Sequence, residues 1–319
     1  MKALTLSTFG GSDVLEYRDV PDPVLKPGEL LVEMKAIGLN FADIMRRKGV
    51  SPLRGNQPYI NGYEGAGIVI DSNHNTGFVN GDRVAFADVP FANAERVAVS
   101  VDHAIPLSPN ISFEFAASIL LQGLTAQFLT ADSHKIKSSD TVVIHAIAGG
   151  VGQLLLQIGK LMGAHVIGLT STDAKKDLAI SLGADAVFLY EEDWKSKILT
   201  LHPRGVDVVY NSIGTTMEGS LAVTKTRGQV VFYGMAGGSL EIGNPLIIIG
   251  TSKTITGGDL WDYLTSREER IKKSAELFRW ITDGKITVTP PAVFRLSDGR
   301  QAHDLLENRK STGKIIMIP

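Results

Sequence analysis

The sequence predicts an α/β protein of two domains, a β-rich domain and a doubly wound parallel sheet. A chain of 319 residues is long enough for both, because single domains commonly have about 100–200 residues. Short alternating segments occupy residues 1–120, whereas strands and helices alternate from about Leu124 onward. We expect residues 1–122 and 265–319 to form the first domain and residues 123–264 the second.

The first domain is predicted from segments in which apolar residues alternate, as in strands with one buried face. Turn residues, mostly Gly, Pro, Asn and Asp, separate these segments. One helix interrupts the pattern from about Asn40 to Lys48 and ends at Gly49. The predicted strands are residues 2–6, 30–38, 66–71, 83–87 and 96–99.

The second domain is predicted from regular alternation of strand and helix, which is typical of a parallel sheet with helices on both faces. A tail follows, and we expect it to fold back onto the first domain. The predicted strands are residues 142–146, 165–169, 186–189, 206–210 and 229–233. The predicted helices are residues 151–162, 174–182, 193–201 and one from about Thr216, with tail helices at 267–282 and 300–308 before a last strand at 314–318.

Composition excludes several kinds of site and partner. A net charge of −2 and a pI of about 6.4 provide no broad basic surface for nucleic acid or an anionic membrane. The chain has no cysteine, which excludes disulfides and cysteine zinc sites and fits a reducing cytoplasm. The longest apolar run, residues 246–249, has the length of a core strand, far from the roughly 18 residues that cross a membrane. The N-terminal segment has no apolar signal region, so we expect a cytoplasmic protein.

The strongest functional signal is the segment VVIHAIAGGVGQLLLQ, residues 142–157. An apolar strand leads into a glycine-rich loop, which opens an apolar helix. Glycine lets the backbone approach a pyrophosphate, and the helix N-terminus offers free N–H groups to it. A tight turn for packing is the alternative. We expect a dinucleotide to be bound by Ala148, Gly149, Gly150, Val151 and Gly152.

The end of the next strand indicates which nicotinamide cofactor is bound. NAD enzymes usually place Asp or Glu there, about 20 residues past the loop, to bond the ribose hydroxyls. Here the strand ends in Thr170 and Ser171, whose small neutral side chains leave room for a phosphate, and Lys175 follows as a cationic partner. Tyr190, after the third strand, is either part of the same pocket or a strand-end aromatic residue. The predicted cofactor is NADPH.

Short motifs are spread over nearly the whole chain. They read GGSDVLEY, KAIGLNFADIMRRKG, GYEGAG, GDRVA, AIAGGVG, SLGAD, VVYNSIG and TGKIIMIP. In this order they resemble the quinone oxidoreductase (zeta-crystallin-like) branch of the medium-chain dehydrogenase/reductases. The resemblance implies a GroES-like catalytic domain, a Rossmann NADPH-binding domain and hydride transfer from NADPH to a quinone.

The resemblance extends to the place where alcohol dehydrogenases of this superfamily bind catalytic zinc. Their histidine ligand lies in a Gly-His-Glu motif, whereas this chain reads Gly62-Tyr63-Glu64 and has no cysteine for the other ligands. An alkoxide is hard to stabilise without a Lewis acid, so alcohol oxidation is not expected. Zinc-free relatives reduce quinones or activated C=C bonds, whose own carbonyl spreads the incoming charge while the protein positions the reactants.

The resemblance also places candidate catalytic residues on and near the first-domain helix. Asn40 and Asp43 match residues that line the nicotinamide pocket, although both also suit a helix start. Tyr63 is a candidate for facing substrate, and Glu64 for supporting the pocket from beneath. Ser51 stands where the family typically has a tyrosine, the usual candidate for donating a proton to an enolate. Because solvent can protonate a quinone oxyanion, this departure weakens C=C reduction more than quinone reduction.

Further cofactor residues are transferred from the family by position alone. Ligands of open α/β sheets bind at the carboxyl ends of strands, which is where these residues are expected. His145 on the first strand is instead expected to be a packed core histidine. The transferred residues are Ser212, Tyr233, Gly234, Met235, Gly258, Asp259, Leu260 and Lys314.

Three functions stay open at this point. The first is an NADPH:quinone reductase; the second is an NADPH-dependent enone or enoyl-thioester reductase, with Arg46, Arg47, Lys48 and Arg54 as candidates for a CoA contact. The third is a non-enzymatic NADPH- or RNA-binding protein, against which the slight negative charge argues. The family commonly forms homodimers through the last Rossmann strand, and residues 254–257 suit such an edge, so a homodimer is expected.

Overall fold

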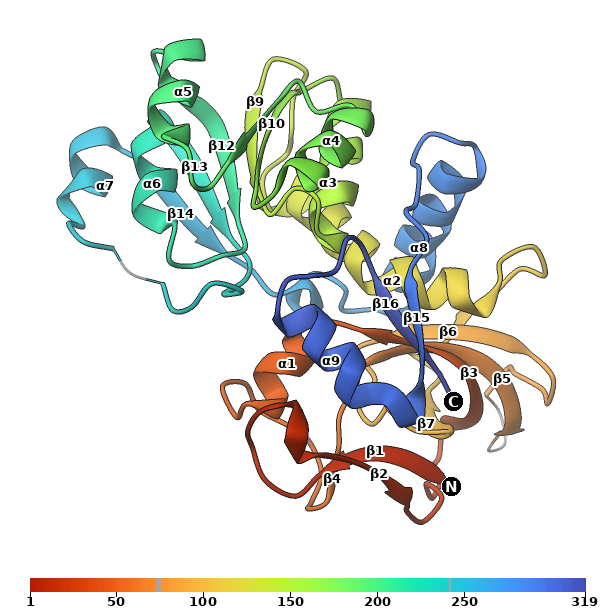
Figure 1. Ribbon diagram of the computed structural model, residues 1–319. Helices are drawn as coiled ribbons and strands as arrows, with labels where there is room; N and C mark the ends of the chain where they lie inside the picture. Colours follow the sequence, from red (N-terminus) through yellow and green to blue (C-terminus); the bar gives the residue numbers. More distant parts are fainter. Residues whose placement is uncertain (73–75, 241) are drawn as a thin grey trace. The chain divides into compact units, whose positions relative to one another are not determined.

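The chain folds into two compact units, seen in a computed structural model that describes residues 1–72, 76–240 and 242–319 (Figure 1). The first unit consists of Met1–Gln122, Leu264–Arg279 and Val288–Pro319. The second consists of Gly123–Tyr263 and Trp280–Thr287. Two helices, α2 (Phe113–Phe128) and α8 (Arg267–Thr282), contribute residues to both units.

The first unit contains two sheets. A three-stranded antiparallel sheet has the order β2-β1-β4, and a larger, mostly antiparallel sheet has the order β15-β16-β3-β5-β6-β8, with β7 also paired to β3. The strands are β1 (Lys2–Leu6), β2 (Leu15–Asp19), β3 (Glu29–Leu39), β4 (Tyr59–Ile60), β5 (Glu64–Ser72), β6 (Arg83–Ala87), β7 (Arg96–Ser100), β8 (Ile105–Pro106), β15 (Ala292–Arg295) and β16 (Ile315–Ile318). The helices are α1 (Phe41–Arg47) and α9 (Gly299–Glu307), with short 3₁₀ turns η1 (Ser12–Val14) and η4 (Leu296–Asp298).

Strand β3 is the centre of the first unit. Side chains on one face of it, including Leu30, Val32 and Met34, are buried in the core, as its alternating pattern predicts. The C-terminal strand β16 runs antiparallel to it, with Ile315 opposite Leu39. This register brings residue 314 next to residue 40 although they are far apart in the sequence.

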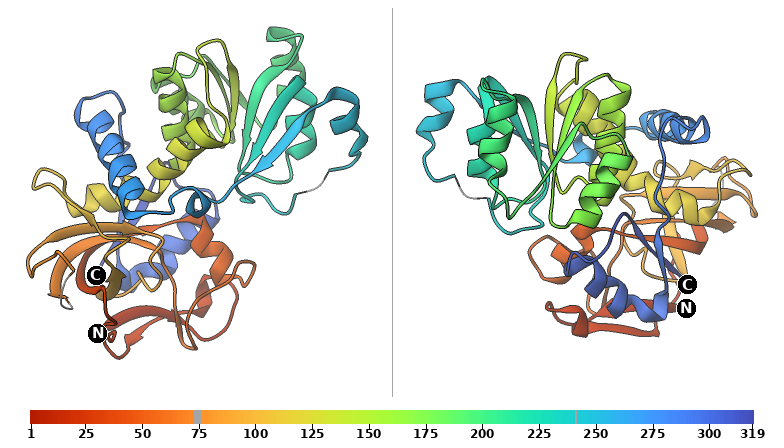
Figure 2. Two further views of the ribbon diagram at one scale, coloured as in Figure 1. Left: turned by 180° about the vertical axis from the view of Figure 1, so that it is seen from behind. Right: turned by 45° about the horizontal axis from the view of Figure 1, so that its top comes forward.

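The second unit is a six-stranded parallel sheet with the order β11-β10-β9-β12-β13-β14. Helices α3 and α4 cover one face and α5 and α6 the other (Figures 1 and 2), so the predicted doubly wound sheet is confirmed. The strands are β9 (Thr141–His145), β10 (His165–Thr170), β11 (Ala186–Leu189), β12 (Val206–Asn211), β13 (Thr224–Phe232) and β14 (Thr254–Gly257). The helices are α3 (Gly150–Leu161), α4 (Asp173–Ser181), α5 (Trp194–Leu201), α6 (Met217–Val223) and α7 (Leu246–Thr251), with short turns η2 (Leu129–Ser133) and η3 (Leu260–Asp262).

Two apolar stretches fold differently from the prediction. Residues 113–128 form α2, a helix that the reading of residues 1–120 as strands with a single helix did not include. The apolar run at residues 246–249 lies in α7 and not in a core strand, with Leu246 and Ile249 exposed. An apolar run of four residues fits both structures, so only the surroundings decide between them. Across the described ranges, no helix is long and apolar enough to span a bilayer.

Candidate functional site

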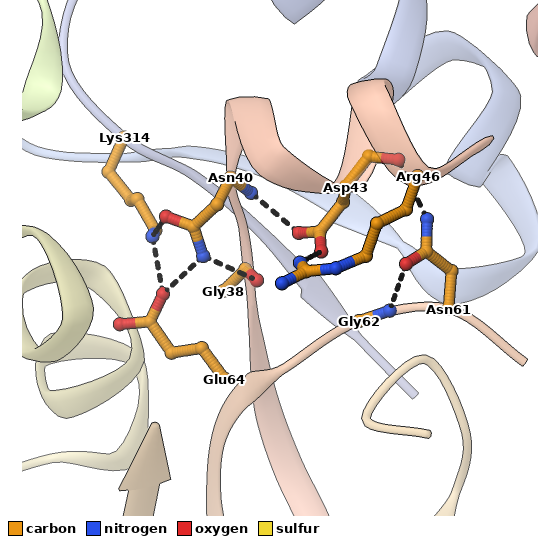
Figure 3. A network of polar contacts seen from close by, with 8 residues as sticks. All are labelled: Gly38, Asn40, Asp43, Arg46, Asn61, Gly62, Glu64 and Lys314. Atoms are coloured by element: carbon orange, nitrogen blue, oxygen red, sulfur yellow. Dashed lines mark hydrogen bonds and ion pairs between the residues drawn. The ribbon is translucent and has the colours of Figure 1, made fainter. Parts of the chain in front are cut away.

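Helix α1 begins with a reciprocal polar contact between its first residues. The Asp43 carboxylate accepts a hydrogen bond from the Asn40 backbone N–H at 2.9 Å and forms an ion pair with Arg46 at 3.1 Å. Asn61 donates to the Asp43 backbone carbonyl at 2.8 Å (Figure 3). Asp43 is fully buried, and burial raises the pKa of its carboxyl while the Arg46 charge opposes that rise.

The Asn40 side chain is held by a buried ion pair. Lys314 Nζ donates to Asn40 Oδ1 at 2.7 Å and to Glu64 Oε2 at 2.5 Å, while Asn40 Nδ2 donates to the same Glu64 oxygen at 2.8 Å (Figure 3). The other Glu64 oxygen accepts from the Leu121 backbone N–H at 2.7 Å. Because each partner is buried and engaged, the amide of Asn40 has one preferred orientation.

Gly38 makes this arrangement possible. A Cβ at Gly38 would lie 2.3 Å from a Glu64 carboxylate oxygen and 2.5 Å from the Ala117 carbonyl oxygen. Real Cβ atoms essentially never come so close to another heavy atom. The glycine in the GLN segment therefore provides the space in which the ion pair sits.

Tyr63 joins the same cluster through Arg46. The guanidinium carbon of Arg46 lies 3.6 Å from the centroid of the Tyr63 ring, the geometry of a cation–π contact. Burial raises the pKa of the Tyr63 phenol, and the positive charge of Arg46 works against that rise. The phenol is consequently neutral at physiological pH and carries a proton that it can donate.

Ser51 and Arg47 make other contacts within the first unit. Ser51 lies shortly after the end of α1, and its backbone N–H donates a hydrogen bond to the Met45 carbonyl at 3.3 Å. Arg47 is fully buried, donates to the Gly10 carbonyl at 3.1 Å and pairs with Glu307, so it holds α1 to its neighbours. Arg47 thus has a structural role here.

Arg46 and Lys314 show what the sequence analysis missed at this site. Arg46 follows Asp43 by three residues, a spacing at which helical side chains meet, so the ion pair could have been inferred from the sequence. Lys314 is predicted to lie at the cofactor, and its hydrogen bonds to Asn40 and Glu64 were not predicted. Lys314 is 250 residues from Glu64 and 274 residues from Asn40 in the sequence, so no local sequence pattern indicates these contacts.

The glycine loop of the second unit has a conformation that suits a pyrophosphate. Ala146 adopts a left-handed φ of 51°, and its carbonyl accepts a hydrogen bond from the Gly149 N–H at 2.8 Å. A Cβ at Gly152 would lie 2.4 Å from that same carbonyl, so only glycine fits there. Gly149 is the N-cap of α3, and within the described chain no side chain caps it. The first-turn N–H groups of Gly150, Val151 and Gly152, beside Ala148, therefore fit phosphate oxygens.

The end of the next strand has neutral side chains at residues 170–172. Thr170 is buried at the end of β10, and Ser171 after it is exposed. Thr172 caps α4 by accepting from the Lys175 N–H at 3.4 Å, which places Lys175 on the first turn of that helix. Tyr190 donates its backbone N–H to the Thr170 carbonyl at 2.9 Å.

The remaining strand ends lie along the same edge of the sheet. At β12 and β13, the Ser212 carbonyl accepts from the Ala236 N–H at 2.9 Å, and burial raises the pKa of Tyr233 to about 12. Gly234 is packed so closely that a Cβ would lie 3.2 Å from the Ser212 carbonyl, and the Met235 carbonyl accepts from the Gly238 N–H. After β14, Gly258 lies against the Phe128 ring, Asp259 caps a short turn, and Leu260 is buried.

Two family models match the chain. The alcohol dehydrogenase GroES-like domain matches residues 26–140, and the zinc-binding dehydrogenase domain matches residues 150–278. The first lies mostly on the β-rich unit and the second mostly on the unit with the parallel sheet. The predicted fold class, a GroES-like domain with a Rossmann domain, is confirmed.

Several relatives that match over the full chain are named as oxidoreductases or reductases. The chain is 35% identical to the quinone oxidoreductase of Pseudomonas aeruginosa, with 100% of this chain and 99% of the relative covered. It is 31% identical to the 2-haloacrylate reductase of a Burkholderia species, with 99% and 98% covered. The crystal structure of Escherichia coli quinone oxidoreductase complexed with NADPH matches with a TM-score of 0.94 at 34% identity, covering 100% of both chains. The chain therefore belongs to the quinone oxidoreductase branch of the medium-chain dehydrogenase/reductases.

Proposed function

We propose that this protein is an NADPH-dependent quinone oxidoreductase that works without a metal. The observation that carries the proposal is the end of β10, where Thr170 and Ser171 replace the acid typical of NAD enzymes and Lys175 follows on α4. The E. coli relative that matches over the full chain was crystallised with NADPH. A cationic side chain beside small neutral ones favours the 2′-phosphate of NADPH over the diol of NADH.

The two units have separate roles in this proposal. NADPH supplies a hydride when it is bound. The second unit holds the pyrophosphate at residues 148–152 and the 2′-phosphate near Lys175, and the strand ends from Ser212 to Leu260 hold the rest of the cofactor. The first unit provides the substrate pocket, with Asn40 oriented by Lys314 and Glu64. Hydride addition leaves an oxyanion on the quinone, and solvent supplies the proton that completes the hydroquinone.

NADPH oxidation with 1,4-benzoquinone tests this function. The absorbance of NADPH is followed with purified protein, and a reaction without protein corrects for the slow direct transfer of hydride. The Ser51→Tyr variant is measured beside it. Enzyme-dependent oxidation by the unmodified protein is the expected result and would show that tyrosine at position 51 is dispensable. No turnover with any quinone by either protein would contradict the proposal.

Reduction of an activated C=C bond is a second candidate, favoured by the Tyr63 phenol and by the 2-haloacrylate reductase among the relatives. Tyr63 is buried and protonated, and its ring centroid lies 3.6 Å from the guanidinium carbon of Arg46, so its phenol is suited to protonating an enolate. If this activity exists, Tyr63→Phe should lower kcat for an enone by about 10²-fold or more while quinone turnover is nearly unchanged. Tyr59→Phe, which keeps the stacking of Tyr59 on Phe9, is the matched control.

We propose three further properties. The protein forms a homodimer through β14, the outer strand of the parallel sheet. It acts in the cytoplasm, because a chain without cysteine suits a reducing compartment. It binds no nucleic acid, because its net charge of −2 provides no broad attraction for phosphates. A salt-dependent RNA binding assay with the purified protein tests the last point.

A further inference from the structure

A buried polar network lies at the start of the glycine loop. Its centre is His145, the last residue of β9, which is fully buried. His145 Nε2 contacts Ser220 Oγ at 2.9 Å, and Nδ1 lies 3.3 Å from both the Tyr190 hydroxyl and Thr216 Oγ1. Burial lowers the pKa of His145 to about 3, so the ring is neutral and has one donor and one acceptor nitrogen.

The network ends on backbone groups of two loops. On one side, the Tyr190 hydroxyl accepts a hydrogen bond from the Ala146 N–H at 2.8 Å. On the other side, Asn211 donates to Ser220 at 2.9 Å, and its side-chain oxygen accepts from the N–H groups of Ile213 and Gly214 at 2.9 and 3.0 Å. Both loops follow adjacent parallel strands, β9 and β12.

Ala146 is the residue through which this network reaches the phosphate loop. An alanine at a φ of 51° is less stable than in an ordinary conformation, so its surroundings must hold it there. Its carbonyl accepts from Gly149 and packs against Gly152. Rotation of the peptide at Ala146 would therefore displace the first turn of α3.

We infer that Tyr190 and His145 are positioning residues for the pyrophosphate of the dinucleotide. His145 orients the Tyr190 hydroxyl, the hydroxyl holds the Ala146 N–H, and Ala146 fixes the N–H groups at the start of α3. The inference rests on the proposed binding of NADPH. It assigns Tyr190 a role through the protein backbone, which differs from a direct contact with the 2′-phosphate.

A positioning role for Tyr190 and a direct contact with the 2′-phosphate predict different effects of a Tyr190 substitution on NADPH and NADH binding. The pyrophosphate is common to NADPH and NADH, so loss of a positioning residue weakens both by a similar factor. Loss of a direct partner of the 2′-phosphate weakens NADPH alone. Lys175→Ala is therefore a reference for the second behaviour.

The test measures the dissociation constants of both nucleotides by calorimetry for the unmodified protein, Tyr190→Phe and Lys175→Ala. For Tyr190→Phe we expect a rise of about tenfold with each nucleotide, the usual consequence of one lost hydrogen bond. His145→Leu should give a similar rise, and His145→Gln a smaller one, because an amide keeps a donor and an acceptor. Tyr210→Phe is the matched control: it removes another buried phenol hydrogen bond of this unit, to the Leu129 carbonyl at 3.1 Å.

Hydrogen exchange at the Ala146 amide provides a second readout that needs no nucleotide. We expect faster exchange in Tyr190→Phe and no change in Tyr210→Phe. Unchanged exchange, unchanged affinities, or a loss confined to NADPH would overturn the inference while the proposed function stands. Failure of the unmodified protein to bind NADPH would overturn the proposed function itself.

Discussion

Lys314 shows how one residue can organise a site from a distance in the sequence. Its ammonium group is buried and contacts Glu64 and Asn40, so one cation both neutralises a carboxylate and orients an amide. A buried ion pair gains its attraction only after both ions lose water, so its net contribution is small. Removal of one partner is costly because the other ion stays buried alone.

The ion pair therefore predicts strong non-additivity. Lys314→Met should lower the free energy of unfolding by about 3–5 kcal/mol, since it leaves a buried carboxylate without a cation. Glu64→Gln should be similarly costly, and the double variant should be less destabilised than the sum of the two. Urea unfolding measures all three. Additive losses would show that the two groups are not coupled. The control is Lys2→Met, which removes the exposed ion pair with Asp19 and should change the free energy of unfolding very little.

His303 makes stability depend on pH. Burial lowers its pKa to about 3, with the Arg47 charge acting in the same direction. The unfolded chain, with a pKa near 6.5, then binds a proton that the folded chain does not, so stability falls as pH drops from 6.5 toward 3. This histidine should account for a loss of about 2 kcal/mol between pH 7 and pH 5. Between pH 7 and pH 5, the free energy of unfolding of His303→Asn should fall by about 2 kcal/mol less than that of the unmodified protein, as measured by urea unfolding. An equal loss in the variant would refute the assignment, and exposed His165→Asn is the control.

At the scale of elements, the glycine loop and α3 act as one part. The Ala146 carbonyl accepts a hydrogen bond from the Gly149 N–H and leaves no room for a Cβ at Gly152, so the loop and the helix cannot move independently. Gly152→Ala places a methyl group 2.4 Å from that carbonyl, and overpacking of this kind costs about 1–3 kcal/mol. We expect NADPH affinity to fall by about tenfold or more, measured by calorimetry.

A second glycine of the same helix is the control for this variant. A Cβ at Gly159 would lie 3.3 Å from a Val166 methyl group, a side chain that can adjust. Gly159→Ala should keep the NADPH affinity of the parent protein. Equal affinity losses in the two variants would mean that helix packing in general, and not the loop, controls binding.

At the scale of the whole molecule, the outer edge of the parallel sheet offers a surface for a second copy. Strand β14 has the backbone groups of one edge unpaired within the sheet order, and α7 exposes Leu246 at 65% and Ile249 at 78%. Exposed strand edges with apolar neighbours tend to pair with other chains. We expect a solution mass of twice the 34.3 kDa of one chain.

Light scattering measures this mass directly. The double variant Leu246→Lys/Ile249→Lys should shift it toward that of one chain, because two cations would be buried in the interface. The control is Val24→Lys, which changes an apolar residue of the first unit that is 87% exposed. It should leave the solution mass unchanged. A parent protein that is monomeric at micromolar concentration would rule out the proposed dimer.

Local patterns in the sequence were enough to predict most of the fold and part of the candidate site. The glycine loop, the neutral end of β10 and the strand–helix alternation all lie within short segments, so their signals are contained in neighbouring residues. The sequence also determined the family, through motifs spread over the whole chain.

Contacts between side chains far apart in the sequence depend on the tertiary structure. Antiparallel pairing of β16 with β3 brings Lys314 to Asn40 and Glu64, and parallel pairing of β9 with β12 brings His145 to Ser220 and Asn211. It also decided that residues 246–249 form a helix, since a run of four apolar residues suits helix and strand equally. Strand register and burial depend on contacts across the sheet, and these have no periodicity that a linear sequence displays.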